Sequence, residues 1–157
     1  MAVKYWITGH KSGLGHFLLR NLNSSIAFDP RVEGSIKKVQ NVEQITLINC
    51  GFKRVMHGET VCYDDFQNNI LLQSQLAELP FKRSILCSSV DVYPLDAKLN
   101  KETREIYNSE IDSVYSYQKL LNEHFFLNSN QANTVLRLPM LIGNNCQDNS
   151  LTRMIRG

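Results

Sequence analysis

Tyr115 and Lys119 are the residues whose types and spacing most directly suggest chemistry. They lie four residues apart in a segment with helical spacing, so both side chains share one face of the expected helix. A tyrosine has a pKa of about 10, and a nearby ammonium favours the phenolate, which brings the group toward acid–base work near neutral pH. The pair therefore predicts proton transfer at a substrate hydroxyl. A chance Tyr-x-x-x-Lys spacing in an ordinary helix is the alternative.

Two serines supply a hydroxyl that could act beside this pair. Ser88 and Ser89 end an apolar run that is expected to be a buried strand. A hydroxyl at the end of such a strand suits a hydrogen bond to a reacting oxygen, whereas the simpler interpretation is a pair of serines that closes a strand. The functional interpretation gains weight because a glycine turn, the serines and the Tyr–Lys pair each fall at the ligand edge of a strand or on the adjoining helix.

The glycine turn interrupts an apolar segment near the N-terminus. Residues 3–7 are rich in β-branched and aromatic side chains and predict a strand buried on both faces. Helical spacing then follows at Leu14, Phe17, Leu18 and Leu22. Gly9, Gly13 and Gly15 let the backbone approach a ligand, and free N–H groups at a helix start attract an anion. The turn is therefore a candidate cradle for a dinucleotide pyrophosphate, with a turn that binds nothing as the alternative.

An acidic residue stands where it could contact the ribose of a bound nucleotide. A short strand is expected at residues 26–29, and Pro30 ends it. Asp29 lies 20 residues after Gly9, at a strand end from which a carboxylate reaches a ribose hydroxyl. An Asp in a turn before Pro is equally compatible with the pattern. By their charge, Lys11 and Arg31 favour the additional phosphate of NADP.

The remaining elements must bring these residues together. Further strands are expected at 45–49, at 84–88 with a continuation through 94, and at 134–137, with helices over 64–79 and 113–127. Residues 32–44 have no clear pattern, 95–110 and 143–149 are expected loops, and a further helix begins at 151–155. Because strands alternate with helices, the expected fold class is α/β, a Rossmann-type doubly wound parallel sheet of about five strands with helices on both faces.

Composition excludes several classes of protein. A chain of 157 residues with 43% hydrophobic and 20% charged residues suits one globular domain, and a net charge of +2 gives no support for nucleic-acid binding. No segment has the pattern of a secretory signal or the length of a membrane span, so we expect a cytoplasmic protein that does not bind membranes. The four cysteines and four histidines lack metal-ligand spacing, which predicts reduced thiols and no metal site.

Taken together, the motifs resemble the extended short-chain dehydrogenase/reductase family, the NAD(P)-dependent epimerases and dehydratases of sugar nucleotides and related reductases. The resemblance runs from about residue 3 to 156, and its motifs are at residues 8–15, 49–51, 69, 88–93, 115–119 and 136–139. It implies that a hydride passes between a substrate carbon and the nicotinamide. It further implies that Ser89 and Tyr115 bind the substrate oxygen, that Tyr115 transfers its proton, and that Lys119 holds the nicotinamide ribose and lowers the pKa of the tyrosine.

The cofactor expected from this resemblance is NAD or NADP, with NADP slightly favoured. The residues expected to bind it are Gly9, Lys11, Ser12, Gly13, Leu14, Gly15, Asp29, Asn49, Cys50, Gly51, Asn69, Tyr115, Lys119 and Pro139. The expected partners are a small-molecule substrate, which could be a nucleotide sugar, and a second copy of the chain. In the family the helices at 64–79 and 113–127 form the dimer contact, so the resemblance implies a homodimer.

Several residues depart from the family pattern. Ser12 takes the place of the middle glycine, and Met140 stands where sugar-nucleotide epimerases commonly carry an Asn. Asp91 matches a dehydratase Glu, but Val90 does not match the neighbouring Asp. The family continues into a C-terminal substrate domain, so we expect residues 1–157 to be an NAD(P)-binding Rossmann domain without that part. The alternatives are a non-catalytic dinucleotide-binding module or inactive fragment, and an interaction protein with a degenerate site.

Overall fold

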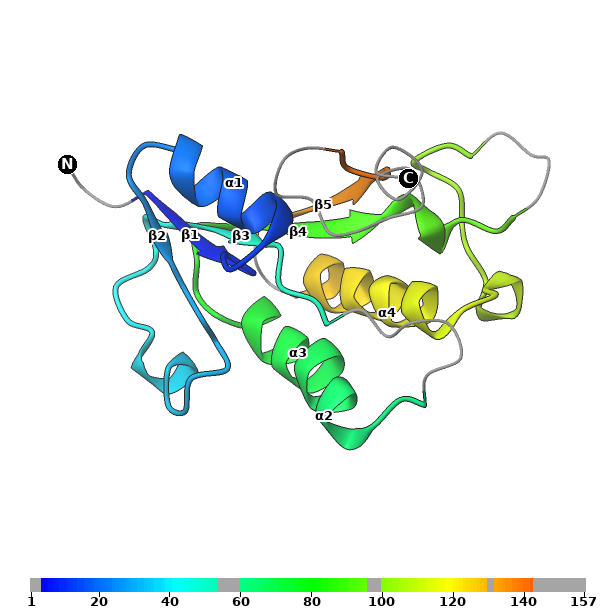
Figure 1. Ribbon diagram of the computed structural model, residues 1–157, viewed down its shortest axis with the longest axis horizontal. Helices are drawn as coiled ribbons and strands as arrows, with labels where there is room; N and C mark the ends of the chain where they lie inside the picture. Colours follow the sequence, from blue (N-terminus) through cyan, green and yellow to red (C-terminus); the bar gives the residue numbers. More distant parts are fainter. Residues whose placement is uncertain (1–3, 54–59, 96–99, 130–131, 143–157) are drawn as a thin grey trace, which may run out of the picture.

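The computed structural model describes residues 4–53, 60–95, 100–129 and 132–142. Five strands form one parallel sheet in the order β2-β1-β3-β4-β5 (Figure 1). The strands are β1 (Tyr5–Thr8), β2 (Ser25–Ala27), β3 (Thr46–Asn49), β4 (Arg83–Ser89) and β5 (Asn133–Leu138). The helices are α1 (Gly13–Asn21), α2 (Tyr63–Phe66), α3 (Leu72–Ala77) and α4 (Val114–Asn128). Shorter helical segments are η1 (Ile36–Lys38), the π-helical η2 (Gln67–Leu71), η3 (Val90–Val92) and η4 (Asn108–Glu110).

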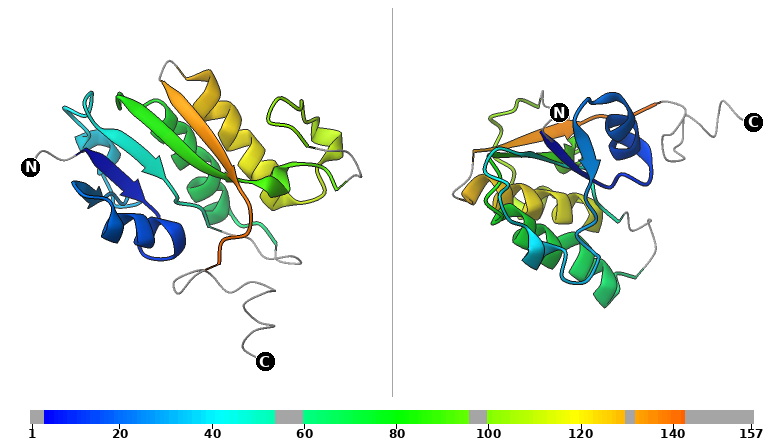
Figure 2. Two further views of the ribbon diagram at one scale, coloured as in Figure 1. Left: turned by 90° about the horizontal axis from the view of Figure 1, so that it is seen from above. Right: turned by 90° about the vertical axis from the view of Figure 1, so that its left-hand side faces the viewer.

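The strand order places the beginning of the chain near the middle of the sheet. β1 pairs with β2 on one side and with β3 on the other, and every pairing is parallel. Helix α1 covers one face, while α2, α3 and α4 cover the other (Figures 1 and 2). The predicted doubly wound α/β fold of five strands is therefore confirmed. Open sheets of this kind bind ligands where the strand order reverses, here beyond the carboxyl ends of β1 and β3.

Hydrophobic side chains fill the space on both faces of the sheet. Neighbouring strand residues such as Leu47 and Ile48 point to opposite faces and belong to two separate core clusters. The cluster beneath α3 and α4 contains Phe28, Val42, Leu47, Leu76, Ala77, Phe81, Leu86 and Phe126. The cluster beneath α1 contains Ile7, Ile48 and Cys87, with Leu14, Leu18, Leu19 and Leu22 packed against it. Burial of these side chains stabilises the sheet. It also fixes α1, which follows the glycine turn, and α4, which follows β4.

Two predicted apolar positions do not face the core. Phe17 on α1, one of the positions with helical spacing, is 55% exposed, and Phe66 on α2 is 44% exposed. In α1 the neighbouring Leu18 and Leu19 reach the sheet instead. The helix expected at 64–79 exists as α2, η2 and α3, and its π-helical turn changes which side chains face inward. A 3.6-residue period cannot anticipate that change.

The strand predicted to continue through residue 94 is also wrong. β4 ends at Ser89, and residues 90–92 form η3. The Ser89 hydroxyl accepts a hydrogen bond from the Asp91 backbone N–H at 3.2 Å, which closes a local turn and competes with extension of the strand. The chain therefore leaves the sheet directly after Ser89.

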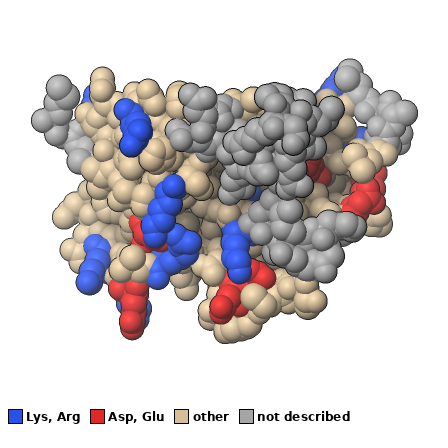
Figure 3. Space-filling model, in the orientation of Figure 1, with Lys and Arg blue, Asp and Glu red and all other residues tan. Residues whose placement is uncertain are grey.

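The sequence also gives expectations for residues 32–44, for the last residues of the chain and for the surface. In the described part of the chain, residues 32–44 contain only the short η1, in agreement with their lack of pattern. The loop expected at 143–149 and the helix at 151–155 lie outside the described residues. Among the helices that the structure describes, none is long and apolar enough to cross a membrane. On the face shown in Figure 3, the Lys and Arg side chains of the described residues are interspersed with acidic ones.

Candidate active site

The glycine turn joins β1 to α1 at the carboxyl edge of the sheet. Gly9 and Gly13 have positive φ angles of 64° and 54°, a region that favours glycine. A Cβ added to Gly9 would lie 2.6 Å from the Cys50 carbonyl oxygen, and one added to Gly15 would lie 2.5 Å from the Gly9 oxygen. The turn therefore packs backbone against backbone, and it places the start of α1 beside the segment that follows β3.

A buried polar network joins the turn to the end of β3. The Thr8 hydroxyl donates to the Asn49 amide oxygen at 2.6 Å, and the Asn49 amide nitrogen donates to Gln73 at 2.6 Å. The Gly51 N–H donates to the Thr8 hydroxyl at 3.0 Å. Asn49 is only 1% exposed, so its side chain is directed into the protein. This network holds the Cys50–Gly51 backbone against the glycine turn.

Asn69 fixes the next part of the same segment. Its amide donates to the Lys53 carbonyl at 2.7 Å and accepts from the Lys53 N–H at 2.8 Å. The amide also donates to the Gln118 side chain on α4 at 3.0 Å. Asn69 lies within the π-helical turn and is fully buried, so it positions the segment around Phe52 through these bonds.

Tyr115 and Lys119 lie against Phe52 on the face of α4 that meets this segment. The Tyr115 and Phe52 rings meet edge to face with centroids 5.3 Å apart. The Lys119 ammonium lies 4.3 Å from the Phe52 ring centre and 5.9 Å from the Tyr115 ring centre. It also donates a hydrogen bond to the Cys87 carbonyl oxygen at 3.0 Å. The structure thus brings the phenol, the ammonium and the carboxyl end of β4 together.

Ser88 and Ser89 have different surroundings at the end of β4. The Ser88 hydroxyl donates to Glu123 on α4 at 2.5 Å, and Arg137 on β5 binds the same carboxylate through Nε and Nη2. The Arg137 guanidinium lies 4.6 Å from the Tyr93 ring centre. Ser88 therefore belongs to a buried structural network. Ser89 is 8% exposed and lies two residues after Cys87, whose carbonyl accepts the Lys119 bond.

Lys119 is 6% exposed, and burial lowers its pKa to about 8, while negative charge on the Cys87–Cys50 pair and on Glu123 acts in the opposite direction. The unfolded chain then binds more protons than the folded chain between about pH 8 and the ordinary lysine value of 10.5, so this residue makes stability rise with pH in that window. Relative to Lys119→Met, the unfolding free energy of the wild type is expected to increase by about 2–3 kcal/mol from pH 8 to 10.5. Urea denaturation of both proteins across this range measures the difference.

Lys53 provides the control for this prediction. A hydrogen bond from Lys53 to Asp65 raises the pKa of Lys53 above 10.5, so its contribution to stability is lost only above that value. For Lys53→Met, the difference from the wild type is therefore not expected to increase between pH 8 and 10.5. A flat difference for Lys119→Met, or the same rise in both variants, would contradict the effect assigned to burial.

Asp29 lies beyond the end of β2 and is held by two cations. Arg31 binds its carboxylate through Nε at 2.9 Å and Nη2 at 3.0 Å, and the Lys11 ammonium lies 3.1 Å from it. The hydrogen bonds from Arg31, and then those from Lys11, hold the pKa of Asp29 well below its usual range. The structure thus joins Asp29, which the sequence suggested for the nucleotide ribose, to Lys11 and Arg31, which it suggested for the additional phosphate of NADP. The two basic side chains are 55% and 70% exposed, so they remain accessible from solvent.

The other predicted residues lie along the same sheet edge or just beyond it. Ser12 precedes α1 as its N-cap residue, and Leu14 in α1 packs against the cluster beneath that helix. Pro139 follows β5, and its side chain is exposed. The assignment of cofactor contacts to individual residues stays a prediction. Cys50, Cys62 and Cys87 are free cysteines, whereas Cys146 lies outside the described residues. No cluster of three potential metal ligands occurs among the described residues.

Sequence reasoning missed several side chains that hold the site together. These are Phe52, Gln73, Gln118, Glu123 and Arg137. Glu123 follows Lys119 by four residues, so helical spacing could have placed both on one face. Phe52 gave no signal beyond its position next to Gly51, because its contact with Tyr115 depends on how two distant segments pack.

Comparisons with known proteins agree with this architecture. The model of the NAD dependent epimerase/dehydratase family matches residues 6–157. No match was found among curated proteins. A dTDP-4-dehydrorhamnose reductase of Bacillus anthracis, solved with NADP, is 19% identical with a TM-score of 0.80, and the alignment covers 99% of this chain and 59% of that one.

Two further solved structures have the same fold. A dTDP-4-dehydrorhamnose reductase ortholog of Clostridium acetobutylicum is 23% identical with a TM-score of 0.74, covering 98% of this chain and 59% of that one. The UDP-glucuronic acid 4-epimerase of Bacillus cereus, solved with UDP-glucuronic acid and NAD, is 18% identical with a TM-score of 0.66, covering 86% and 56%. This chain therefore spans less than two thirds of the length of each of these structures.

Proposed function

This chain belongs to the NAD-dependent epimerase/dehydratase family, and we propose that it is the cofactor-binding and catalytic core of an enzyme acting on a nucleotide sugar. In this proposal residues 1–157 form an NAD(P)-binding domain, and Tyr115 is the acid–base group. The observation that carries the proposal is the position of Lys119, whose ammonium lies beside the Tyr115 ring and is bonded to the carboxyl end of β4. The glycine turn lies at the same edge of the sheet, so cofactor and acid–base group would meet there.

The residues at this edge fit a dinucleotide. The α1 N-terminus offers backbone N–H groups to a pyrophosphate, and the closely packed glycines leave no side chain in its path. Asp29 would accept hydrogen bonds from an adenosine ribose, whereas Lys11 and Arg31 would attract the phosphate that distinguishes NADP. When bound, the nicotinamide supplies a hydride acceptor or donor. NADP is slightly favoured by the two basic side chains.

Side chains of this protein would transfer the proton and hold the substrate oxygen. The Lys119 ammonium stabilises the phenolate of Tyr115, so the phenol can release a proton to, or take one from, a substrate oxygen. The Ser89 hydroxyl, at the end of β4, would hold that oxygen with a hydrogen bond. Phe52 shields both groups from water on one side. A low local dielectric strengthens the interaction between the ammonium and the phenolate.

The substrate class rests on the similar structures. Their names refer to dTDP-4-dehydrorhamnose and UDP-glucuronic acid, which are both nucleotide sugars. We propose a substrate of that class for this chain, with a hydroxyl or carbonyl carbon as the reacting centre. A cytoplasmic location fits such a substrate and stays a prediction.

Titration with NADPH and NADH, followed by nicotinamide fluorescence or calorimetry, tests cofactor binding. We expect both to bind, with NADPH somewhat tighter. In Arg31→Ala the affinity for NADPH should fall by about tenfold, because a charge-assisted bond to the phosphate is lost and the Asp29 carboxylate is left less neutralised. Arg83→Ala, at the opposite end of a strand, is the control and should bind as the wild type does. Absence of binding by the wild type at millimolar concentrations of either cofactor would refute the proposed function.

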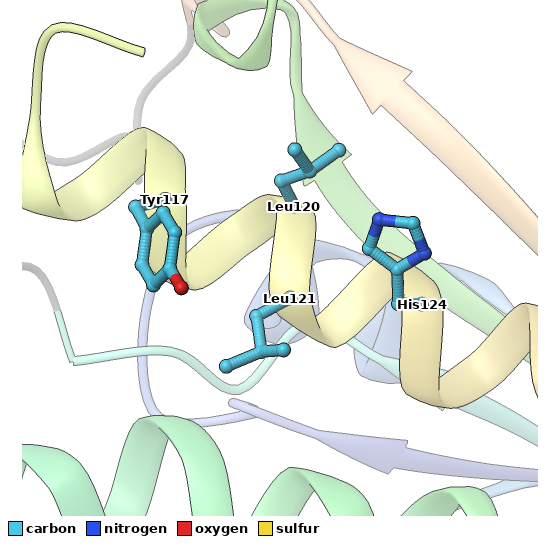
Figure 4. Close-up of a pocket in the computed structure, with 4 residues that line it drawn as sticks. All are labelled: Tyr117, Leu120, Leu121 and His124. Carbon is cyan, nitrogen blue, oxygen red and sulfur yellow. The ribbon is translucent and has the colours of Figure 1, made fainter. Parts of the chain in front are cut away.

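We further propose that α2 to α4 form the contact of a homodimer. A hollow on α4 is lined by Tyr117, Leu120, Leu121 and His124, all of which come from that helix (Figure 4). The surrounding surface exposes large apolar side chains, namely Tyr63, Phe66, Leu71, Val114, Tyr117 and Leu127. An apolar surface of this kind on neighbouring helices suits a second copy of the same helices.

Sedimentation velocity at micromolar concentration is expected to show a dimer. Leu121→Glu places a charge in the hollow and should shift the protein to monomer, because burying an unpaired carboxylate opposes association. Leu95→Glu, at a residue that is 93% exposed, is the matched control and should remain dimeric. A wild type that sediments as a monomer would contradict this arrangement.

A further inference from the structure

Two thiols touch at the floor of the candidate site. The sulfur atoms of Cys50 and Cys87 lie 3.5 Å apart, in contact at the carboxyl ends of neighbouring strands. Cys87 is 8% exposed and Cys50 is half-buried, and both belong to the cluster beneath α1. The proposed reaction uses neither sulfur. The proposed reaction therefore does not explain this contact.

The register of β3 and β4 brings the two residues within reach of a disulfide. Asn49 and Leu86 are register partners in the parallel pair β3–β4, so the residues that follow them are neighbours across the two strands. Adjacent strands are about 4.8 Å apart, within the range of about 4.4–6.8 Å between the Cα atoms of a disulfide. Both side chains project toward the same face of the sheet. A bond between Cys50 and Cys87 would require the sulfurs to approach from 3.5 Å to about 2.05 Å, which draws the Cys50 segment toward β4.

The electrostatic surroundings favour a thiolate in this pair. The hydrogen bond with the Cys50 thiol lowers the pKa of Cys87, and the Lys119 ammonium lowers it further, although burial opposes both effects. The same hydrogen bond, together with burial, raises the pKa of Cys50. Cys87 is therefore the more nucleophilic sulfur, and Cys50 is a thiol held in contact with it.

We propose that Cys50 and Cys87 are an oxidation site at which hydrogen peroxide produces an intramolecular disulfide, and that this disulfide weakens dinucleotide binding. The Cys87 thiolate attacks one peroxide oxygen, the O–O bond breaks, and Cys87 becomes a sulfenic acid as hydroxide leaves. The Cys50 sulfur then attacks the Cys87 sulfur, the S–O bond breaks, and a second hydroxide leaves. The two thiol protons convert both hydroxides to water. The sulfurs lose two electrons, which the peroxide gains.

The size of the oxidant matters because the pair is enclosed. Hydrogen peroxide is little larger than water, so it can reach the sulfur of Cys87, a residue that is 8% exposed, more readily than a bulky disulfide reagent can. The exposed Cys62 lies at the start of α2, where its thiol donates to Asp65 at 3.0 Å. It belongs to a separate surface environment and gives an internal comparison.

The disulfide would act on the glycine turn through the Cys50 backbone. The Cys50 carbonyl lies where a Gly9 Cβ would approach to 2.6 Å, and the next residue donates its N–H to Thr8. Drawing Cys50 toward Cys87 therefore shifts a backbone on which the turn is packed. Oxidation also removes the thiolate beside Lys119. This consequence for binding rests on the proposed function, whereas formation of the disulfide does not.

Intact-protein mass spectrometry tests the bond in a Cys62→Ser, Cys146→Ser background, where only the proposed pair remains. After treatment with hydrogen peroxide, unfolding in urea and then N-ethylmaleimide, we expect a mass lower by two hydrogens and no alkylation. Dithiothreitol added before the alkylation should restore the two hydrogens and allow both cysteines to be alkylated. Peptide mapping should show a link between Cys50 and Cys87. Two alkylated cysteines, or separate sulfinic acids without a link, would refute the oxidation site.

Single replacements supply the controls. In the same background, Cys87→Ser leaves one thiol that cannot form an internal bond, so this thiol should be alkylated fully once the protein is unfolded in urea. In a protein with all four cysteines, we expect Cys50 to be linked to Cys87. A disulfide that joins Cys50 or Cys87 to Cys62 or Cys146 would overturn the proposal.

Titration with NADPH in both oxidation states tests the effect on binding. The disulfide form is expected to bind about tenfold more weakly than the reduced form, the loss that corresponds to one misaligned charged hydrogen bond. Equal affinities in both states would refute the coupling, even if the disulfide forms. Failure of the reduced protein to bind at all would refute the proposed function instead, and the mass measurement would still decide whether the oxidation site exists.

Discussion

Gly9→Ala is expected to destabilise the protein by about 3 kcal/mol or more, because two separate costs act at this position. Its φ of 64° is unfavourable for any residue with a Cβ, and the added carbon would lie 2.6 Å from the Cys50 carbonyl oxygen. The opposing backbone cannot easily retreat, since Thr8 and Asn49 both accept the Gly51 N–H. Urea denaturation measures the loss, and NADPH titration of the folded fraction should show no binding.

Gly34 and Gly15 separate the cost of the positive φ from the cost of the close contact. Gly34 has a φ of 71°, but the nearest atom to an added Cβ is the Lys38 Cε at 3.9 Å, so Gly34→Ala should cost only about 1–2 kcal/mol from conformation. Gly15 has no positive φ, but its Cβ would approach the Gly9 oxygen to 2.5 Å, so Gly15→Ala tests the close approach alone. Equal losses in Gly9→Ala and Gly34→Ala would show that the contact with Cys50 is unimportant.

Tyr115→Phe is expected to lower turnover by about 10²- to 10⁴-fold, the usual contribution of a positioned acid–base group. The ring, its contact with Phe52 and the fold remain, so NADPH affinity and stability should change little. Turnover can be followed with UDP-glucuronic acid and dTDP-4-dehydrorhamnose as probes, through nicotinamide absorbance and chromatography of the sugar products. Loss of turnover without loss of cofactor binding would identify a group that acts in the chemical step.

Tyr117→Phe is the matched control. Tyr117 lies on the same helix but is 45% exposed and lines the outer hollow of α4, so its hydroxyl should not affect turnover. Activity of Tyr115→Phe within a few-fold of the wild type would remove Tyr115 from the mechanism. A wild type that binds NADPH but converts neither probe would favour the alternative of a non-catalytic dinucleotide-binding module.

Much of the fold could be predicted because it depends on local patterns. The strand around Leu47 and the helix that carries Tyr115 follow directly from β-branched runs and helical spacing, and their alternation predicts the parallel sheet. Predictions failed where a local interaction competes with the period. The Ser89 hydroxyl turns the chain into η3, and the π-helical turn around Asn69 alters which side chains face inward.

The candidate site was predictable only in part. The order of the glycine turn, serines and Tyr–Lys pair is visible in the chain, and the match to the family confirms the resemblance that they carry. The supports of the site are not visible. Glu123 joins Ser88 to Arg137 across a helix and two strands, and Phe52 meets Tyr115 from a different segment. Such contacts depend on long-range packing, which no spacing along the chain encodes.

By itself, the sequence determined the kind of elements, their order and the family, because these follow from side-chain type and short-range periodicity. Only the tertiary structure decided that Lys119 bonds to the end of β4, that Asn49 faces inward, and that two cysteines 37 positions apart touch. The physical reason is that pairing β3 with β4 sets the distance between residues remote in sequence, and burial then changes the charges that those residues can hold.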